Sequence, residues 1–219
     1  MMGLMALSKT KSDLLVLAFA SLAEWTAWLE AQPSASKGVW LKLAKAASSG
    51  MPSISKQEAI DGALCHGWID GQLDKFDANH WLVRFTPRRR KGKWSRINRE
   101  RALALIELGR MRPAGLREIE EAKRDGRWDA AYAPQSNATV PQDLQSALDR
   151  KPAAKRHFDQ LDSHNRYAIL YRIHDAKKPE TRAQRIEKYV TMLSRGEAIH
   201  PKRVPTQSSR RRPPRSPAR

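Results

Sequence analysis

The hydrophobic periodicity of this chain changes near residue 134, and this change limits the folds that the chain can adopt. Before residue 134, segments in which apolar and polar residues alternate lie between segments with helical spacing. Beyond Pro141 only helical spacing remains. Alternation is typical of strands, and spacing of three and four residues is typical of helices. The sequence therefore predicts an α+β fold: a small α/β N-terminal domain with a β-hairpin, followed by a C-terminal helical bundle.

Two capping boxes mark helix starts in the N-terminal part, Ser21 with Glu24 and Ser55 with Glu58. Residues 39–45 alternate as a strand does, and residues 68–87 read as two strands around a turn. Ser95 can cap a later helix, and Pro113 can begin another. For the helix after Ser95 we expect a buried stripe formed by Ile97, Ala104, Leu105 and Leu108.

These patterns divide the chain into four predicted parts. An N-terminal extension covers residues 1–12, the α+β domain covers 13–133, and the helical region covers 134–199. Residues 200–219 contain seven Lys and Arg and no acid, with almost no apolar residues. Such a segment cannot bury enough apolar surface to offset its ordering entropy, so we expect a disordered basic tail.

The N-terminus and the cysteine content bear on location. The single cysteine, Cys65, is consistent with a reducing compartment. The stretch "LLVLAFASLA" after Lys9 and Lys11 resembles a secretory signal, but cleavage near Ala20 or Ala23 would cut the helix start at Ser21. No stretch approaches the length of a membrane span. We therefore predict a cytoplasmic protein, with a periplasmic location as the alternative if the N-terminal segment is a signal.

Several stretches resemble one family. They include "GWIDG", "RFTPR" and the long C-terminal segment "RYAILYRIHDAKKPETRAQRIEKYV". Together they are similar to the bacterial YdeI or OmpD-associated proteins, also labelled bacteriocin-protection proteins, over about residues 13–200. The resemblance implies protection against bacteriocins or cationic antimicrobial peptides, association with an outer-membrane porin and a periplasmic location. It supplies no catalytic residues.

No familiar enzyme motif occurs in the chain. A Gly-rich phosphate loop, a dinucleotide fingerprint and a nucleophile elbow are all missing from the sequence. Cys65 and His66 are neighbours, and neighbours on a helix point about 100 degrees apart, so they do not form a nucleophile and base pair. We interpret Cys65 as a small buried thiol, and we predict no cofactor and no metal site.

The best candidate site combines a basic stretch with a short glycine-flanked motif. Residues 84–102, "RFTPRRRKGKWSRINRERA", carry nine Lys and Arg against one acid, in a chain of net charge +18. They join a strand end to a helix start, where free backbone N–H groups attract anions. "GWIDG" adds a tryptophan for stacking and an aspartate as acceptor. The candidate ligand-binding residues are Trp68, Asp70, Arg84, Thr86, Arg88, Trp94, Ser95 and Asn98.

Each feature also has a structural interpretation. The basic stretch can be a solvated loop, and "GWIDG" can be a C-cap glycine, a core tryptophan and a turn aspartate. We predict a module that binds an anionic small molecule or a phosphate-bearing ligand, or that acts in stress or bacteriocin protection. One alternative is a protein that associates non-specifically with nucleic acid through the basic loop and tail. The other is an enzyme of unfamiliar type that uses Asp70 with Arg84.

Overall fold

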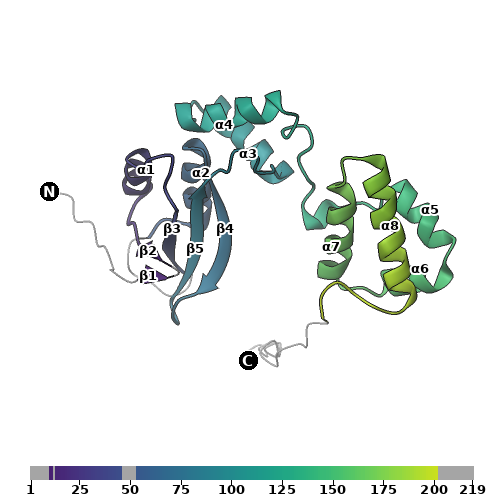
Figure 1. Cartoon of the computed structure of the whole chain (residues 1–219). Coiled ribbons are helices and arrows are strands. Elements are labelled where there is room, and N and C mark those ends of the chain that lie inside the picture. Colours follow the sequence, from purple (N-terminus) through teal and green to yellow (C-terminus); the bar gives the residue numbers. More distant parts are fainter. Residues whose placement is uncertain (1–9, 12, 46–52, 202–219) are drawn as a thin grey trace, which may run out of the picture. The chain divides into compact units, whose positions relative to one another are not determined.

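The computed structural model describes residues 10–11, 13–45 and 53–201. The chain divides into two compact units, Met1–Pro134 and Gln135–Arg219. The first unit is a sheet with helices, and the second is helical (Figure 1). This confirms the predicted α+β class. The predicted disordered tail lies outside the described residues, apart from His200 and Pro201.

A five-stranded sheet forms the centre of the N-terminal unit, with strand order β1-β2-β3-β5-β4. β2 and β3 are parallel, and the other neighbouring strands are antiparallel. The strands are β1 (Thr10–Lys11), β2 (Leu14–Leu17), β3 (Val39–Ala44), β4 (Trp68–Lys75) and β5 (His80–Pro87). The helices of this unit are α1 (Leu22–Glu30), α2 (Lys56–Cys65), α3 (Arg96–Glu107) and α4 (Pro113–Arg124).

The helix starts follow the sequence signals. At Ser55 the capping box is complete, because Ser55 Oγ accepts the Glu58 N–H at 3.2 Å and Glu58 Oε2 accepts the Ser55 N–H at 2.8 Å. At Ser21 the box is only half formed. Ser21 Oγ accepts the Glu24 N–H at 3.3 Å, but the Glu24 carboxylate accepts the Ala20 N–H instead of the Ser21 N–H.

Strand β2 was not expected as a strand, because its residues were read as part of a signal-like apolar run. Three of its four residues are buried. Leu14 and Val16 pack with Trp40 and Leu82 on one face of the sheet, and Leu17 joins the main core. Cleavage near Ala20 or Ala23 would therefore remove a buried strand. None of the helices in the described ranges is long and apolar enough to cross a membrane.

The main core of the N-terminal unit lies between the sheet and its helices. Trp25 of α1 is fully buried, and its Nε1 donates to the carbonyl of Ala59 in α2 at 3.0 Å. Its ring lies 5.3 Å from that of Phe85 in β5, edge to face. Gly67 ends α2 with φ +75°, which few residues other than glycine adopt. The hairpin of β4 and β5 therefore leaves directly from the end of α2.

The buried face of α3 differs from the predicted one. Ala102 and Leu105 are buried, whereas Ile97, Ala104 and Leu108 are exposed. The prediction was correct for Leu105 and wrong for the other three residues. The helix packs through a narrow strip about 100 degrees away from the expected stripe.

The C-terminal unit is a bundle with its own core. After a short 3-10 turn at Gln135–Asn137 it contains α5 (Gln142–Asp149), α6 (Pro152–Asp159), α7 (Ser163–His174) and α8 (Pro179–Ser194). Leu144, Phe158, Ile173 and Leu193 are at most 1 % exposed. The buried amide of Asn165 exchanges two hydrogen bonds with the backbone of His200, which ties the chain after α8 to α7. The predicted helical bundle is confirmed.

Candidate anion-binding site

The chain leaves strand β5 at Pro87, and the next residue turns back into the protein. The Arg88 N–H donates to the carbonyl of Gly67 at 2.9 Å, which holds the loop against the end of α2. The Arg88 guanidinium lies 3.5 Å above the centre of the Trp94 ring, and the residue is only 7 % exposed. Arg89, Arg90 and Lys91 are exposed. The basic stretch is thus a solvated loop with one buried arginine.

A second buried arginine, Arg127, reaches the same loop from the segment after α4. Its Nη1 donates to the carbonyl of Gly92 at 2.9 Å, while Arg88 Nη1 donates to the carbonyl of Lys93 at 3.5 Å. Two consecutive peptide groups therefore hold two guanidinium groups. The Nε of Arg127 pairs with the Asp125 carboxylate at 2.7 Å, so this second cation has its own counter-ion.

The polar atoms that remain without a partner are the main feature of this cluster. Among the described residues, Arg88 Nε, Arg88 Nη2, Arg127 Nη2 and Trp94 Nε1 are buried donors without a hydrogen-bond partner. One buried acceptor in the cluster, Glu118 Oε2, is also unpartnered. Nε and Nη2 form the edge through which a guanidinium binds two oxygens of one anion. Unpaired buried donors are costly, so the cluster favours an acceptor.

The charges of the cluster influence one another without forming an ion pair between Arg88 and Glu118. Burial lowers the pKa of Arg88 to about 10, and the charges of Glu118 and Asp70 oppose this shift. Arg88 is therefore still a cation at neutral pH. Burial, assisted by Glu121, raises the pKa of Glu118, whereas Arg88, Arg127 and Arg117 act against the rise. A carboxyl with a raised pKa thus stands beside two guanidinium groups.

The eight residues predicted as a site do not gather in one place. Asp70 pairs with Phe85, and Thr86 pairs with Ile69, in the antiparallel register of β4 and β5. Directly paired residues share a face of the sheet and neighbours alternate, so Asp70 and Trp68 lie on the opposite face from Arg84 and Thr86. Asp70 with Arg84 therefore makes no common site. Trp68 is 4 % exposed and belongs to the core.

The start of α3 is also not open to a ligand in the way that was expected. Ser95 Oγ accepts the Asn98 N–H at 3.2 Å, so the predicted cap is confirmed. The Arg96 N–H donates to the carbonyl of Tyr132 at 2.9 Å, and the Tyr132 N–H donates to the carbonyl of Trp94 at 3.1 Å. The segment before Pro134 thus covers this helix start. Of the predicted residues, only Arg88 and Trp94 contribute directly to the cluster.

Arg127 and Glu118 were missed by the sequence reasoning. Glu118 occupies a half-buried position in the middle of α4, outside the basic stretch and the "GWIDG" motif from which the site was predicted. Arg127 lies in "DGRWD", directly before the buried Trp128. Trp128 packs edge to face on Trp94 at 4.9 Å, and this contact brings Arg127 to the loop. The pattern of a buried tryptophan beside an arginine was the available signal.

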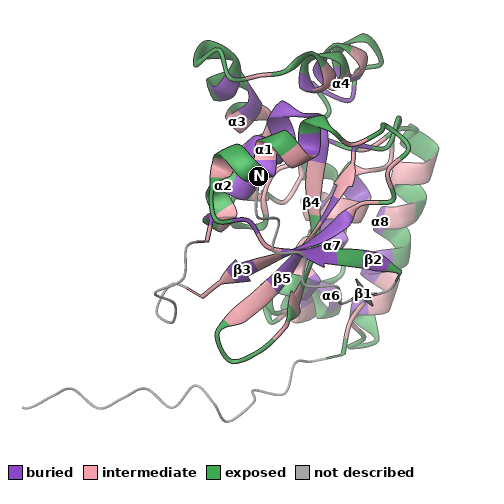
Figure 2. Ribbon diagram, turned by 90° about the vertical axis from the view of Figure 1, so that its left-hand side faces the viewer, coloured by how far each residue is buried: buried purple, intermediate pink, exposed green. Residues whose placement is uncertain are grey.

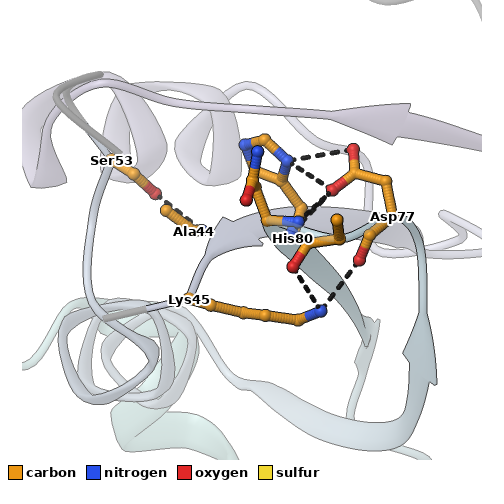
Figure 3. Close-up of polar contacts among 7 residues, drawn as sticks. Ala44, Lys45, Ser53, Asp77 and His80 are labelled. Carbon is orange, nitrogen blue, oxygen red and sulfur yellow. Dashed lines mark hydrogen bonds and ion pairs between the residues drawn. The ribbon is translucent and has the colours of Figure 1, made fainter. Parts of the chain in front are cut away.

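Other polar groups of the unit serve local structure. At the tip of the β4–β5 hairpin, the Asp77 carboxylate accepts the N–H groups of Asn79 and His80 and contacts the His80 ring at 2.9 Å (Figure 3). Lys45 Nζ donates to the carbonyls of Asp77 and Ala78. All of these contacts fasten the turn. Cys65 is buried, and burial raises the pKa of its thiol, which agrees with an unreactive core cysteine.

The geometry thus defines a two-unit protein whose first unit holds a cluster of buried guanidinium groups with unpartnered donor atoms. Residues 137–196 match the family described as "Bacteriocin-protection, YdeI or OmpD-Associated", which confirms the suspected family in the C-terminal unit. Residues 17–118 match a different description, "Domain of unknown function (DUF8412)". The resemblance to this family was expected over residues 13–200, but the family matches only residues 137–196, and most of the N-terminal unit matches the other description. Neither a curated protein nor a solved structure matches the chain significantly.

Proposed function

We propose that the N-terminal unit is a binding module for a small oxyanion, or for a ligand that carries one, at the cluster of Arg88, Arg127 and Trp94. The observation that carries the proposal is the set of four buried, unpartnered donor atoms on these three residues. Lone water molecules can satisfy single donors, but two guanidinium groups in a desolvated site favour negative charge. A tetrahedral sulfate or phosphate group offers enough oxygens for all four donors.

The proposal predicts that sulfate and phosphate raise the melting temperature of the full chain and that Arg88→Gln removes most of this gain. A site-specific anion at about a hundredfold its Kd stabilises the native state by about 2.7 kcal/mol. Arg88 is buried, so its replacement is expected to change the stability of the free protein as well. The relevant measurement is therefore the anion-dependent difference, obtained by differential scanning fluorimetry.

Arg90→Gln is the matched control, because it removes the same charge from an exposed position of the same loop. If both variants lose the gain equally, the anion acts by general screening, and the proposed site is wrong.

The raised pKa of Glu118 predicts that anion binding at the same site depends on pH. Between the ordinary pKa of a glutamate and the raised pKa of Glu118, the native state keeps a proton that the unfolded state has lost. The free energy of unfolding therefore falls as pH rises through this window. A protonated Glu118 no longer repels an anion. We expect the sulfate-dependent gain to be larger at the acidic end of the window and to become nearly independent of pH in Glu118→Gln. Sulfate is the suitable probe, since it stays a dianion throughout. A gain that varies with pH equally in both proteins would exclude Glu118 as the titrating group.

The role of the C-terminal unit remains a broader proposal. Its family description supports a part in bacteriocin protection, and we propose a cytoplasmic location, which fractionation of the source cells tests. The nucleic-acid alternative depends largely on the tail, which lies outside the described residues. No group of three or more His, Cys, Asp and Glu side chains within the described ranges could hold a metal ion.

A further inference from the structure

A groove of about 680 Å³ in the C-terminal unit is lined by residues of α5, of the turn after it and of α8. Binding sites for small molecules commonly measure about 300–1,000 Å³. Along each helix the lining residues recur every three to four positions, so one stripe of each helix faces the groove. Figure 2 shows that α8 carries exposed as well as buried residues. The groove thus has the size of a ligand site and two regular walls.

The least exposed residues that line the groove form its floor, and they are apolar. Ile186 and Val190 of α8 are 8 % and 4 % exposed and belong to the core of the bundle. Ala147 of α5 packs against the same core, and Ala183 of α8 is exposed. A single methyl group at each of these two alanine positions fills little space, so the hollow stays open. An apolar ligand segment on this floor would be removed from water, which favours its binding.

An ion pair among the lining residues joins the starts of the two helices. Arg182 Nε and Nη2 donate to the two carboxylate oxygens of Asp143, and Arg182 Nη1 donates to the carbonyl of Ile173. Every nitrogen of this guanidinium therefore has a partner within the protein. The charges of Arg182 and Asp143 neutralise each other, so an anionic ligand depends on other cations of the groove.

Two such cations, Arg150 and Lys151, line the groove directly after α5. Both are exposed, and neither forms an ion pair with any residue in the described ranges. Apart from Asp143, the only acid that lines the groove is Glu187. With the Arg182 pair neutral, two cations and one anion remain, and the groove carries a net positive charge.

We propose that this groove binds a small amphipathic anion, a carboxylate with an aliphatic body. The body lies on the apolar floor, and the carboxylate meets Arg150 and Lys151. Seven residues separate Asp143 from Arg150, a rise of about 10 Å along a helix, which suits a chain of medium length such as that of decanoate. A cationic ligand is less suitable, because the two unpaired cations would repel it. The groove belongs to the C-terminal unit and the Arg88 cluster to the N-terminal unit, so each proposal can fail without the other.

Isothermal titration calorimetry of the full chain with decanoate, below the concentration at which decanoate forms micelles, tests the proposal. We expect decanoate to bind, and decylammonium to bind roughly tenfold more weakly because its charge is reversed. Arg150→Gln with Lys151→Gln should weaken the affinity for decanoate roughly fivefold, and Glu187→Gln should strengthen it roughly twofold. The control pair is Arg156→Gln with Lys188→Gln, which removes two exposed cations of α6 and α8 outside the groove and should leave the affinity unchanged.

Ala183→Leu assigns the binding to the groove. The larger side chain fills the hollow, so the affinity for decanoate should fall roughly tenfold or more, because the aliphatic body loses its place on the floor. Leucine is a good helix former, so an exposed position of α8 tolerates it. The variant changes no charge and leaves the Arg88 cluster unaltered. Ala153→Leu, at an exposed position of α6 outside the groove, is the matched control and should bind as the unaltered chain does.

Each variant is first compared with the unaltered chain by circular dichroism and melting temperature. If Ala183→Leu alters the fold, Ala147→Leu takes its place. Two results would each overturn the proposal: full decanoate binding by the filled groove, or equal affinities for decanoate and decylammonium. A chain that is dimeric in solution and becomes monomeric in Ala183→Leu would instead assign the groove to self-association.

Discussion

Replacing Trp94 with alanine is expected to lower the free energy of unfolding by about 3–5 kcal/mol, one of the largest effects available in this chain. Trp94 is 2 % exposed and packs against Trp128 in the main core. It also forms the platform beneath the Arg88 guanidinium. The same substitution should therefore abolish the sulfate-dependent gain in melting temperature, because Arg88 loses its fixed orientation.

Trp94→Phe separates the two roles. A phenyl ring keeps much of the buried area and a face for the guanidinium, so this variant should retain part of the stability and part of the anion response. It also removes the unpartnered Nε1 donor. Urea denaturation followed by circular dichroism measures the first quantity. If the free energy of unfolding of Trp94→Ala lies within about 0.5 kcal/mol of that of the unaltered chain, Trp94 does not have the core role that its burial implies.

Gly115→Val is expected to destabilise the N-terminal unit by about 3 kcal/mol. Gly115 lies in the first turn of α4, where a Cβ atom would stand 2.4 Å from the carbonyl oxygen of Cys65 and 2.7 Å from that of Leu64. Both contacts are with backbone atoms at the end of α2, so a rotamer change cannot relieve them. Helix α4 would have to move away and would take Ile119 out of the core.

The comparison for Gly115 is Arg117→Val, which introduces the same side chain at an exposed position of the same helix. Its effect should stay below about 1 kcal/mol, since only the lower helix propensity of valine acts there. Thermal unfolding in the absence of added anion measures both variants. Equal effects of the two substitutions would show that the close approach of α4 to α2 is not needed for stability.

Much of the fold could be predicted because its signals are local. A serine followed three residues later by a glutamate satisfies backbone donors within one turn, so Ser55 marks the start of α2 whatever surrounds it. Gly67 and Pro113 act in the same way at a helix end and a helix start. Strand β2 was missed because four apolar residues carry no period that distinguishes a buried strand from the apolar part of a signal.

The site was harder to predict because it depends on contacts between distant segments. Arg88 and Trp94 were recognised from one basic stretch, but whether an arginine is solvated or buried depends on what packs over it. Glu118 comes from the middle of α4, and Arg127 comes from the turn that follows this helix. Both lie thirty residues or more beyond Arg88 in the sequence. Conversely, Asp70 and Arg84 are close in the hairpin, and the strand register alone separates them onto two faces.

The distribution of aromatic residues gives the N-terminal unit a built-in spectroscopic label that the C-terminal unit lacks. All seven tryptophans precede Pro134, whereas Gln135–Arg219 contains three tyrosines and no tryptophan. Fluorescence excited at the red edge of the absorption band therefore reports on the sheet unit alone. Hydrogen exchange follows the helical bundle separately. Any change in the far-ultraviolet signal that occurs while the tryptophan emission is constant also belongs to the bundle. The order in which the two units unfold is thus accessible without dyes, tags or truncation.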